Sequence, residues 1–173
     1  MRSFSIRVGC SWKDDGAAWK QCLDAIGKVS EDATKRLKKH PKIRTIGALG
    51  TVVEGRKLRA TPALTVLEGV CSAIDSADIL LFDITPEVGQ EQGKANVLFE
   101  LGYAKGRGKE IYLLHRGEFL SSAVPSDLRG AYISTLSKGR FEQALHMRLV
   151  NRCVNHFLNP REVAATEHES FDD

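Results

Sequence analysis

The sequence predicts an α/β protein, a single domain whose five-stranded parallel sheet carries helices on both faces. Two apolar runs, 78–84 and 110–114, have the length and the Ile, Leu and Phe content of strands buried on both sides. The segments between such runs show helical spacing of apolar residues, so strands and helices alternate along the chain. Right-handed crossovers and the strand order 2-1-3-4-5 are the default for this alternation.

The first half of the chain predicts two strands and two helices. Phe4–Cys10 is the first strand, and an amphipathic helix follows over about 15–39. Pro41 prevents this helix from continuing. The next apolar run, 43–49, is the second strand, and a long glycine-containing basic segment follows it. Thr61 before Pro62 is typical of a helix start.

The second half begins with the central strand, 78–84. A helix that ends at Gly106 and a strand at 110–114 complete a strand–helix–strand crossover. The last strand is predicted over 132–136 and the last helix over about 139–158. The apolar face of the crossover helix consists of Val97, Leu98, Leu101 and Ala104.

Length and charge divide the chain into a domain, 1–160, and an acidic tail, 161–173. The 173 residues with 42% hydrophobic content suffice for one core. The tail has one arginine and five acidic residues, so its net charge is −4. Because the formal net charge of the whole chain is +3, residues 1–160 carry a net charge of +7. We expect the tail to be mobile because it has little apolar content. The formal charge does not favour a nucleic-acid partner.

The cysteines and the apolar runs indicate a cytoplasmic protein. The four cysteines are widely spaced, with no CxxC or Cys/His pair, so we expect reduced thiols and no metal site. Residues 1–8 lack the apolar core of a secretory leader, and no run approaches the roughly 20 apolar residues of a membrane span. No membrane partner is expected.

Three polar residues in the crossover unit are candidates for catalysis. Asp83 interrupts the central strand near its carboxyl end, and Glu100 lies within the apolar part of the following helix. Asn96 precedes Glu100 by one helical turn, so both can reach one ligand. A purely structural interpretation stays open, in which Asp83 caps the next turn and Glu100 pairs with a neighbouring Arg or Lys.

The loop after the first strand is a candidate binding segment. Gly9 and Ser11 offer backbone and hydroxyl contacts, and Trp12 offers an aromatic face for a base; a plain turn is the alternative. In the predicted strand order this loop, Asp83 and the helix bearing Glu100 meet at the switch point between the first and third strands.

Four further residues complete the predicted binding set. Arg56 and Arg59 lie in the basic segment after the second strand and would hold phosphates; an exposed loop without a ligand is the alternative. Thr85 and His115 follow or end neighbouring strands at the same edge of the sheet. No GxGxxG sequence follows the first strand and no Walker-type loop occurs, which argues against a dehydrogenase or a P-loop enzyme.

The residues AD-x-x-x-x-D-I-T, N-V-x-x-E-L-G-x-A and GKEIYLL resemble the Toll/interleukin-1 receptor (TIR)-like proteins of bacteria and the nucleoside 2-deoxyribosyltransferase-like group. The resemblance covers about half of the chain. It implies a flavodoxin-like fold and a Glu, here Glu100, that acts at the anomeric carbon of a ribosyl–base bond. Two features of these families are absent. Asn96 and Val97 stand near the position of the Trp and Cys of TIR NAD hydrolases, and the Asp-x-Gly-Thr of the deoxyribosyltransferases does not occur.

The resemblance implies three functions. The first is an N-glycosidase that cleaves NAD, as substrate and not as cofactor, or a related nucleotide, in anti-phage defence. The second is a non-catalytic module that senses a nucleotide and assembles with itself or with other TIR-like domains. The third is a nucleoside 2-deoxyribosyltransferase.

Overall fold

The computed structural model describes residues 4–9, 17–40, 53–57, 66–85, 95–117 and 132–159. Its strands form one sheet in the order β2-β1-β3-β4-β5-β6. Neighbouring strands from β2 to β5 are parallel, and β6 is antiparallel to β5. The strands are β1 (Phe4–Gly9), β2 (Val53–Lys57), β3 (Ile79–Asp83), β4 (Ile111–His115), β5 (Ile133–Ser137) and β6 (Arg140–Phe141).

The sheet differs from the predicted one because it has a sixth strand and is therefore mixed rather than wholly parallel. Lys138 and Gly139 have φ values of 49° and 65°, and Ser137 pairs with Arg140 across them. Two central residues with positive φ make the two-residue turn that suits a tight hairpin. The chain therefore turns back before the last helix, which begins at Gln143 and not at Gly139.

The second strand also departs from the prediction. The expected strand at 43–49 lies outside the described residues, and β2 lies within the segment expected to be a basic loop. Residues 53–57 pair with Phe4–Val8 of β1, at the outer edge of the sheet. An edge strand does not need an apolar sequence, so hydrophobic patterning gives no signal for one.

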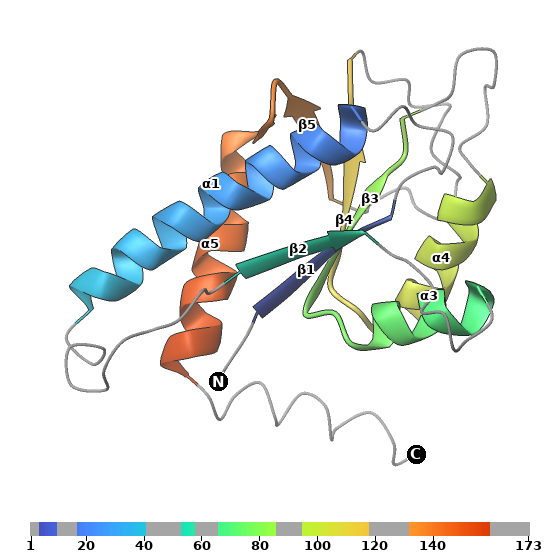
Figure 1. The fold of residues 1–173 in the computed structure, drawn as a ribbon, viewed down its shortest axis with the longest axis horizontal. Helices are drawn as coiled ribbons and strands as arrows, with labels where there is room; N and C mark the ends of the chain where they lie inside the picture. Colours follow the sequence, from blue (N-terminus) through green and yellow to red (C-terminus); the bar gives the residue numbers. More distant parts are fainter. Residues whose placement is uncertain are drawn as a thin grey trace.

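The helices cover both faces of the sheet, which gives three layers (Figure 1). One face is covered by α1 and α5, and the other by α3 and α4. The predicted helix at 15–39 is confirmed over its described part, since α1 is continuous through Gly27. The helices are α1 (Ala17–Lys39), α3 (Val66–Asp75), α4 (Ala95–Gly106) and α5 (Gln143–Leu158).

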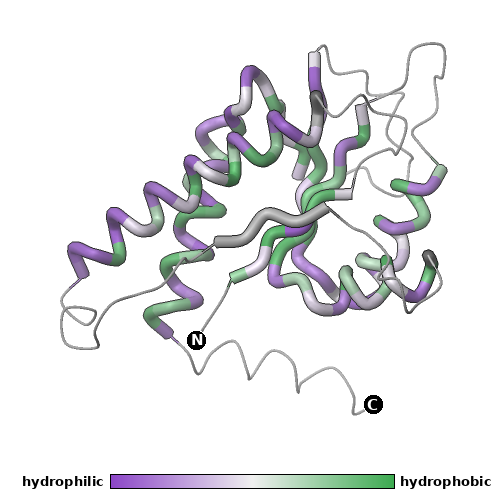
Figure 2. The backbone as a smooth tube through the Cα atoms, viewed as in Figure 1, coloured by the Kyte–Doolittle hydropathy of each residue, from purple (hydrophilic) through white to green (hydrophobic). Residues whose placement is uncertain are grey.

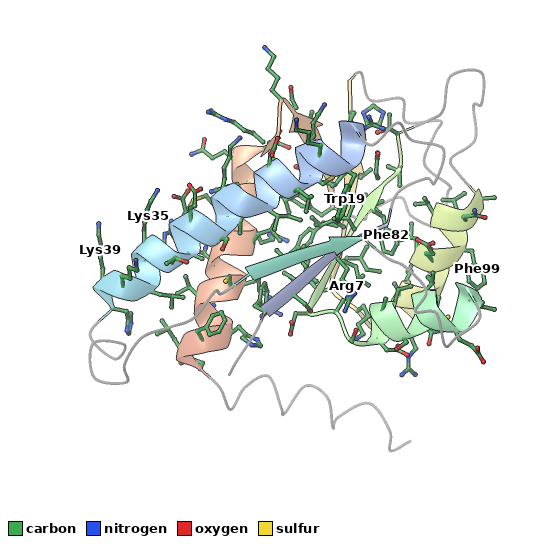
Figure 3. The ribbon with its side chains drawn as sticks, in the orientation of Figure 1. Arg7, Trp19, Lys35, Lys39, Phe82 and Phe99 are labelled. Carbon is green, nitrogen blue, oxygen red and sulfur yellow. The ribbon has the colours of Figure 1, made fainter. Side chains whose placement is uncertain are left out.

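Alternate residues of the central strands enter separate cores on the two faces of the sheet. Ile79 and Leu81 of β3 pack with α1 and α5, whereas Leu80 and Phe82 pack with α3 and α4. Figure 2 shows hydrophobic residues along the central strands and alternating hydropathy along α1. The basic end of α1 is exposed, and Lys35 and Lys39 point away from the sheet (Figure 3).

Two glycines on or against α1 are expected to respond to alanine in opposite directions. Gly139 has positive φ, and a Cβ there would lie 2.9 Å from the Cβ of Asp24. Gly139→Ala should therefore lower the free energy of unfolding by roughly 1–3 kcal/mol. The exposed Gly27 has open space around it, so Gly27→Ala should raise this free energy by up to about 1 kcal/mol. Urea unfolding measures the free energy of unfolding of both variants. Equal effects of the two substitutions would contradict the turn at Lys138 and Gly139.

Candidate functional site

Glu100 lies on the buried face of α4, where an apolar residue would be expected. Val97, Leu101 and Ala104 are the other buried residues of this helix. The side chain of Glu100 is only 7% exposed. A carboxylate is costly to bury without partners, so its position requires an explanation beyond packing.

The carboxylate of Glu100 is directed at the carboxyl end of β1. A Cβ added to Gly9 would lie 3.0 Å from Glu100 Oε2, and 2.4 and 2.6 Å from two ring carbons of Phe82. Gly9 and Phe82 are register partners on adjacent strands, and Phe82 lies on the α4 side of the sheet (Figure 3). Glycine is required at position 9 because the ring and the carboxylate occupy the space that any side chain would need.

Burial dominates the electrostatics of Glu100 and raises its pKa from an ordinary value of 4.5 to about 7. Its Oε2 has no hydrogen-bond partner among the described residues. No described Lys or Arg forms an ion pair with it within 4 Å. The cation that the structural interpretation of Glu100 requires is therefore not found among the described residues.

Asp83 has a different environment. It is fully buried, and its Oδ1 accepts hydrogen bonds from the backbone N–H (3.0 Å) and the hydroxyl of Thr85. Its Oδ2 lies 3.1 Å from Nη2 of Arg116. The structural interpretation of Asp83 is confirmed to this extent: its carboxylate accepts the backbone N–H of Thr85 and so caps the turn that follows β3.

The structure does not bring Asp83 and Glu100 onto one face of the sheet. Asp83 follows Phe82 and pairs in register with Leu114, which belongs to the core beneath α1 and α5. Because side chains alternate along a strand, Asp83 faces α1 and α5, and Glu100 lies on the opposite side. The alternation of β3 therefore places the two carboxylates on opposite faces of the sheet, although both elements end at its carboxyl edge.

Of the other predicted residues, Asn96 and His115 are described and lie at the same edge. Asn96 is exposed one turn before Glu100 on α4. His115 is buried at the end of β4, and burial lowers its pKa. By strand alternation from Leu113, which packs against α3 and α4, His115 faces the Glu100 side. Arg56 lies in β2, but its side chain lies outside the described residues, as do Ser11, Trp12 and Arg59.

Two residues of the site were missed by sequence reasoning. Phe82 reads as one more apolar residue of a buried strand, and its contact with Gly9 depends on the pairing of two distant strands. Arg116 follows β4 in the sequence without any local pattern, and only the parallel pairing of β3 with β4 brings it to Asp83.

A clasp at the other end of the sheet holds α4 against α3. The carboxylate of Asp75 accepts hydrogen bonds from the Tyr103 hydroxyl (3.0 Å) and from Nε of Arg107 (2.9 Å). Both donors lie on or just after α4, and Asp75 ends α3. These hydrogen bonds join α4, the helix that carries Glu100, to α3.

Neither a metal site nor a membrane span is found in the described part of the chain. Its His, Cys, Asp and Glu side chains form no group of three that would hold a metal ion. None of its helices combines the length and the apolar character needed to cross a membrane.

Neither a protein-family model nor a curated protein sequence matches this chain. Among solved structures, a 2-desoxiribosyltransferase from Leishmania mexicana is 17% identical, with 81% of this chain and 79% of that chain covered and a TM-score of 0.43. A WrbA-like flavodoxin from Agrobacterium tumefaciens is 12% identical, with 89% and 74% covered and a TM-score of 0.35. Likeness at this level does not bear on the activity of the chain.

The burial of Glu100 predicts a pH-dependent gain in stability for Glu100→Gln. The folded protein binds the Glu100 proton up to about pH 7, whereas the unfolded chain releases it near 4.5. The wild type therefore loses stability as the pH rises from 4.5 through 7, by up to about 3 kcal/mol. The variant should match the wild type near pH 4.5 and exceed it above pH 7 in urea unfolding.

The control for this experiment is Glu142→Gln, the same change at an exposed glutamate without a side-chain cap bond. Its stability difference from the wild type should stay within about 0.5 kcal/mol across the same pH range. A Glu100→Gln protein that is less stable than the wild type at pH 8 would show that a partner compensates the carboxylate.

The close approach at β1 predicts that Gly9→Ala disrupts the site. The added methyl group would overlap the ring of Phe82, so the free energy of unfolding should fall by roughly 1–3 kcal/mol. Gly102→Ala is the matched control because Gly102 is exposed on α4 with open space around it. Thermal unfolding of both variants tests the contact, which a neutral Gly9→Ala would refute.

Proposed function

We propose that this chain is an N-glycosidase that cleaves the ribose–base bond of NAD or a related nucleotide. The observation that carries the proposal is the buried carboxylate of Glu100, directed at Gly9 between the carboxyl ends of β1 and β3. In open α/β sheets this switch point is where ligands bind. The sequence resemblance around Glu100 supports the same assignment.

The chemistry requires a carboxylate of this kind. When the C–N bond breaks, its electron pair leaves with the base and positive charge develops on the ribose. The ionised Glu100 would stabilise this charge or add to the anomeric carbon, and water would then complete the hydrolysis. In NAD the nicotinamide ring is a positively charged pyridinium. It takes the electron pair of the broken C–N bond and departs as neutral nicotinamide, so this base needs no proton donor.

The neighbouring residues take supporting roles in this proposal. Asn96, exposed one turn before Glu100, would bind ribose hydroxyls. His115 faces the same side and would contact the ligand as a neutral imidazole, because burial lowers its pKa. A low-dielectric setting strengthens the attraction between Glu100 and a developing cation.

Glu100→Gln should lower turnover by about 100-fold or more, because the amide cannot neutralise the ribosyl cation. Purified protein is incubated at high concentration with NAD, NADP and a panel of deoxynucleosides, and the released bases are separated by chromatography. Release of nicotinamide is expected from the wild type. In this proposal kcat/KM rises with pH up to about 7, where Glu100 becomes ionised, and then levels off.

Glu142→Gln serves again as the control and should retain full turnover. Base exchange among deoxynucleosides would identify a deoxyribosyltransferase instead. Full turnover in folded Glu100→Gln protein would exclude Glu100 from the reaction. The absence of reaction with every substrate would favour the non-catalytic module.

A further inference from the structure

The carboxylate of Asp75 is shared between two donors from the end of α4. The hydroxyl of Tyr103 donates to its Oδ2 at 3.0 Å, and Nε of Arg107 donates to its Oδ1 at 2.9 Å. Burial alone would raise the pKa of Asp75, but these hydrogen bonds outweigh it and lower the pKa below the ordinary 3.8. The hydrogen bond to Asp75 raises the pKa of Tyr103 above the ordinary 10. At neutral pH the acceptor is therefore ionised and the hydroxyl keeps its proton, so the bond is charge-assisted.

The acceptor of these bonds has a defined place relative to β1. Asp75 ends α3, and the chain reaches Asp78 three residues later. The carboxylate of Asp78 accepts the backbone N–H of Ser5 at 2.7 Å and the hydroxyl of Ser5 at 3.0 Å. Ser5 lies near the start of β1, and Gly9 ends this strand. The anchor of α4 is therefore attached to the same strand that Glu100 approaches at its other end.

Glu100 and Tyr103 lie one turn apart on α4, about 4.5 Å along the helix axis. The buried apolar side chains of α4 pack on the sheet, but such packing is non-directional. A hydrogen bond restricts both a distance and an angle. The bond of Tyr103 to Asp75 therefore restricts the rotation of α4 about its own axis, and this rotation decides how closely the Glu100 carboxylate approaches Gly9.

The position of Glu100 requires such a restraint. Its side chain is 7% exposed, and its Oε2 has no hydrogen-bond partner among the described residues. An ionised carboxylate in this environment gains free energy when it moves toward water. This tendency acts to turn α4 outward, and the bond between Tyr103 and Asp75 opposes the turn.

We propose that Tyr103 is a positioning residue that holds the Glu100 carboxylate beside Gly9 through its hydrogen bond to Asp75. This inference rests on the proposed function, in which Glu100 must meet the anomeric carbon of the substrate. Position matters for that step, because a displacement of about 1 Å can lower a rate by about 100-fold. Tyr103 does not contact the substrate, and no covalent step is added.

The first measurement follows the ionisation of Glu100 and needs no activity. Protein labelled with ¹³C at its glutamate carboxyl carbons is titrated by NMR, and the Glu100 signal is assigned by its loss in Glu100→Gln. The wild-type midpoint should lie at about 7. In Tyr103→Phe the midpoint should fall by roughly one pH unit or more toward the ordinary 4.5, because the released carboxylate becomes hydrated.

The second measurement is the turnover of NAD. Tyr103→Phe should lower kcat by about 10- to 100-fold and leave KM within about 3-fold, because the substrate still binds while the carboxylate is displaced. Asp75→Ala removes the shared acceptor at a side chain that is 37% exposed, so it serves also where Tyr103→Phe fails to fold. It should reproduce both effects. The double variant should be no worse than Asp75→Ala, because each single change already breaks the bond.

Tyr112→Phe is the matched control. The hydroxyl of Tyr112 donates to the carboxylate of Glu110, which also accepts from Nε of Arg152 at 2.7 Å. This arrangement repeats the clasp at Asp75, but Tyr112 belongs to the core beneath α1 and α5, on the face of the sheet opposite Glu100. The control removes a hydrogen bond of the same kind, so it should leave the Glu100 midpoint and kcat unchanged.

An unchanged Glu100 midpoint in folded Tyr103→Phe would overturn the positioning role. Equal shifts in Tyr103→Phe and Tyr112→Phe would also overturn it, because the effect would then follow from a general loss of stability. A lowered midpoint in Tyr103→Phe, with a wild type that cleaves no nucleotide, would support the positioning and refute the proposed function alone. Turnover that requires Glu100 but is insensitive to Tyr103→Phe and Asp75→Ala would refute only the positioning role.

Discussion

The lack of a side chain at Gly9 is the constraint on which the candidate site depends. It leaves space at the carboxyl end of β1 that the ring of Phe82 and the carboxylate of Glu100 occupy together. A Cβ at this position would overlap the ring of Phe82 and lie 3.0 Å from Glu100 Oε2 on α4, a helix that is also joined to α3 through Asp75. The contact thus joins the parallel pairing of β1 and β3 to the position of the crossover helix.

The two buried carboxylates at this edge show how environment separates residues of the same chemistry. Asp83 is compensated by Arg116 and by hydrogen bonds from Thr85. Glu100 has burial as the dominant influence on its pKa. Among the described residues, no cation compensates Glu100 in the way that Arg116 compensates Asp83. The sheet separates the two carboxylates because consecutive residues of β3 face opposite sides.

Hydrophobic patterning predicted most of the fold because the buried elements carry the strongest local signals. The central strand, the crossover helix and α1 appear in the structure close to the expected positions. Patterning failed for β2, a polar edge strand, and for β6, which depends on the positive φ of Lys138 and Gly139. Neither element buries enough apolar surface to leave a periodic signal in the sequence.

The sequence by itself determined that the chain alternates strands with helices and that Glu100 occupies a buried position of a helix. Both follow from the spacing of apolar residues, which is a local property. Only the tertiary structure decided that Asp83 faces away from Glu100, that Arg116 compensates Asp83, and that Glu100 approaches Gly9. These relations join residues far apart in the chain through strand pairing and helix packing, so no local pattern specifies them.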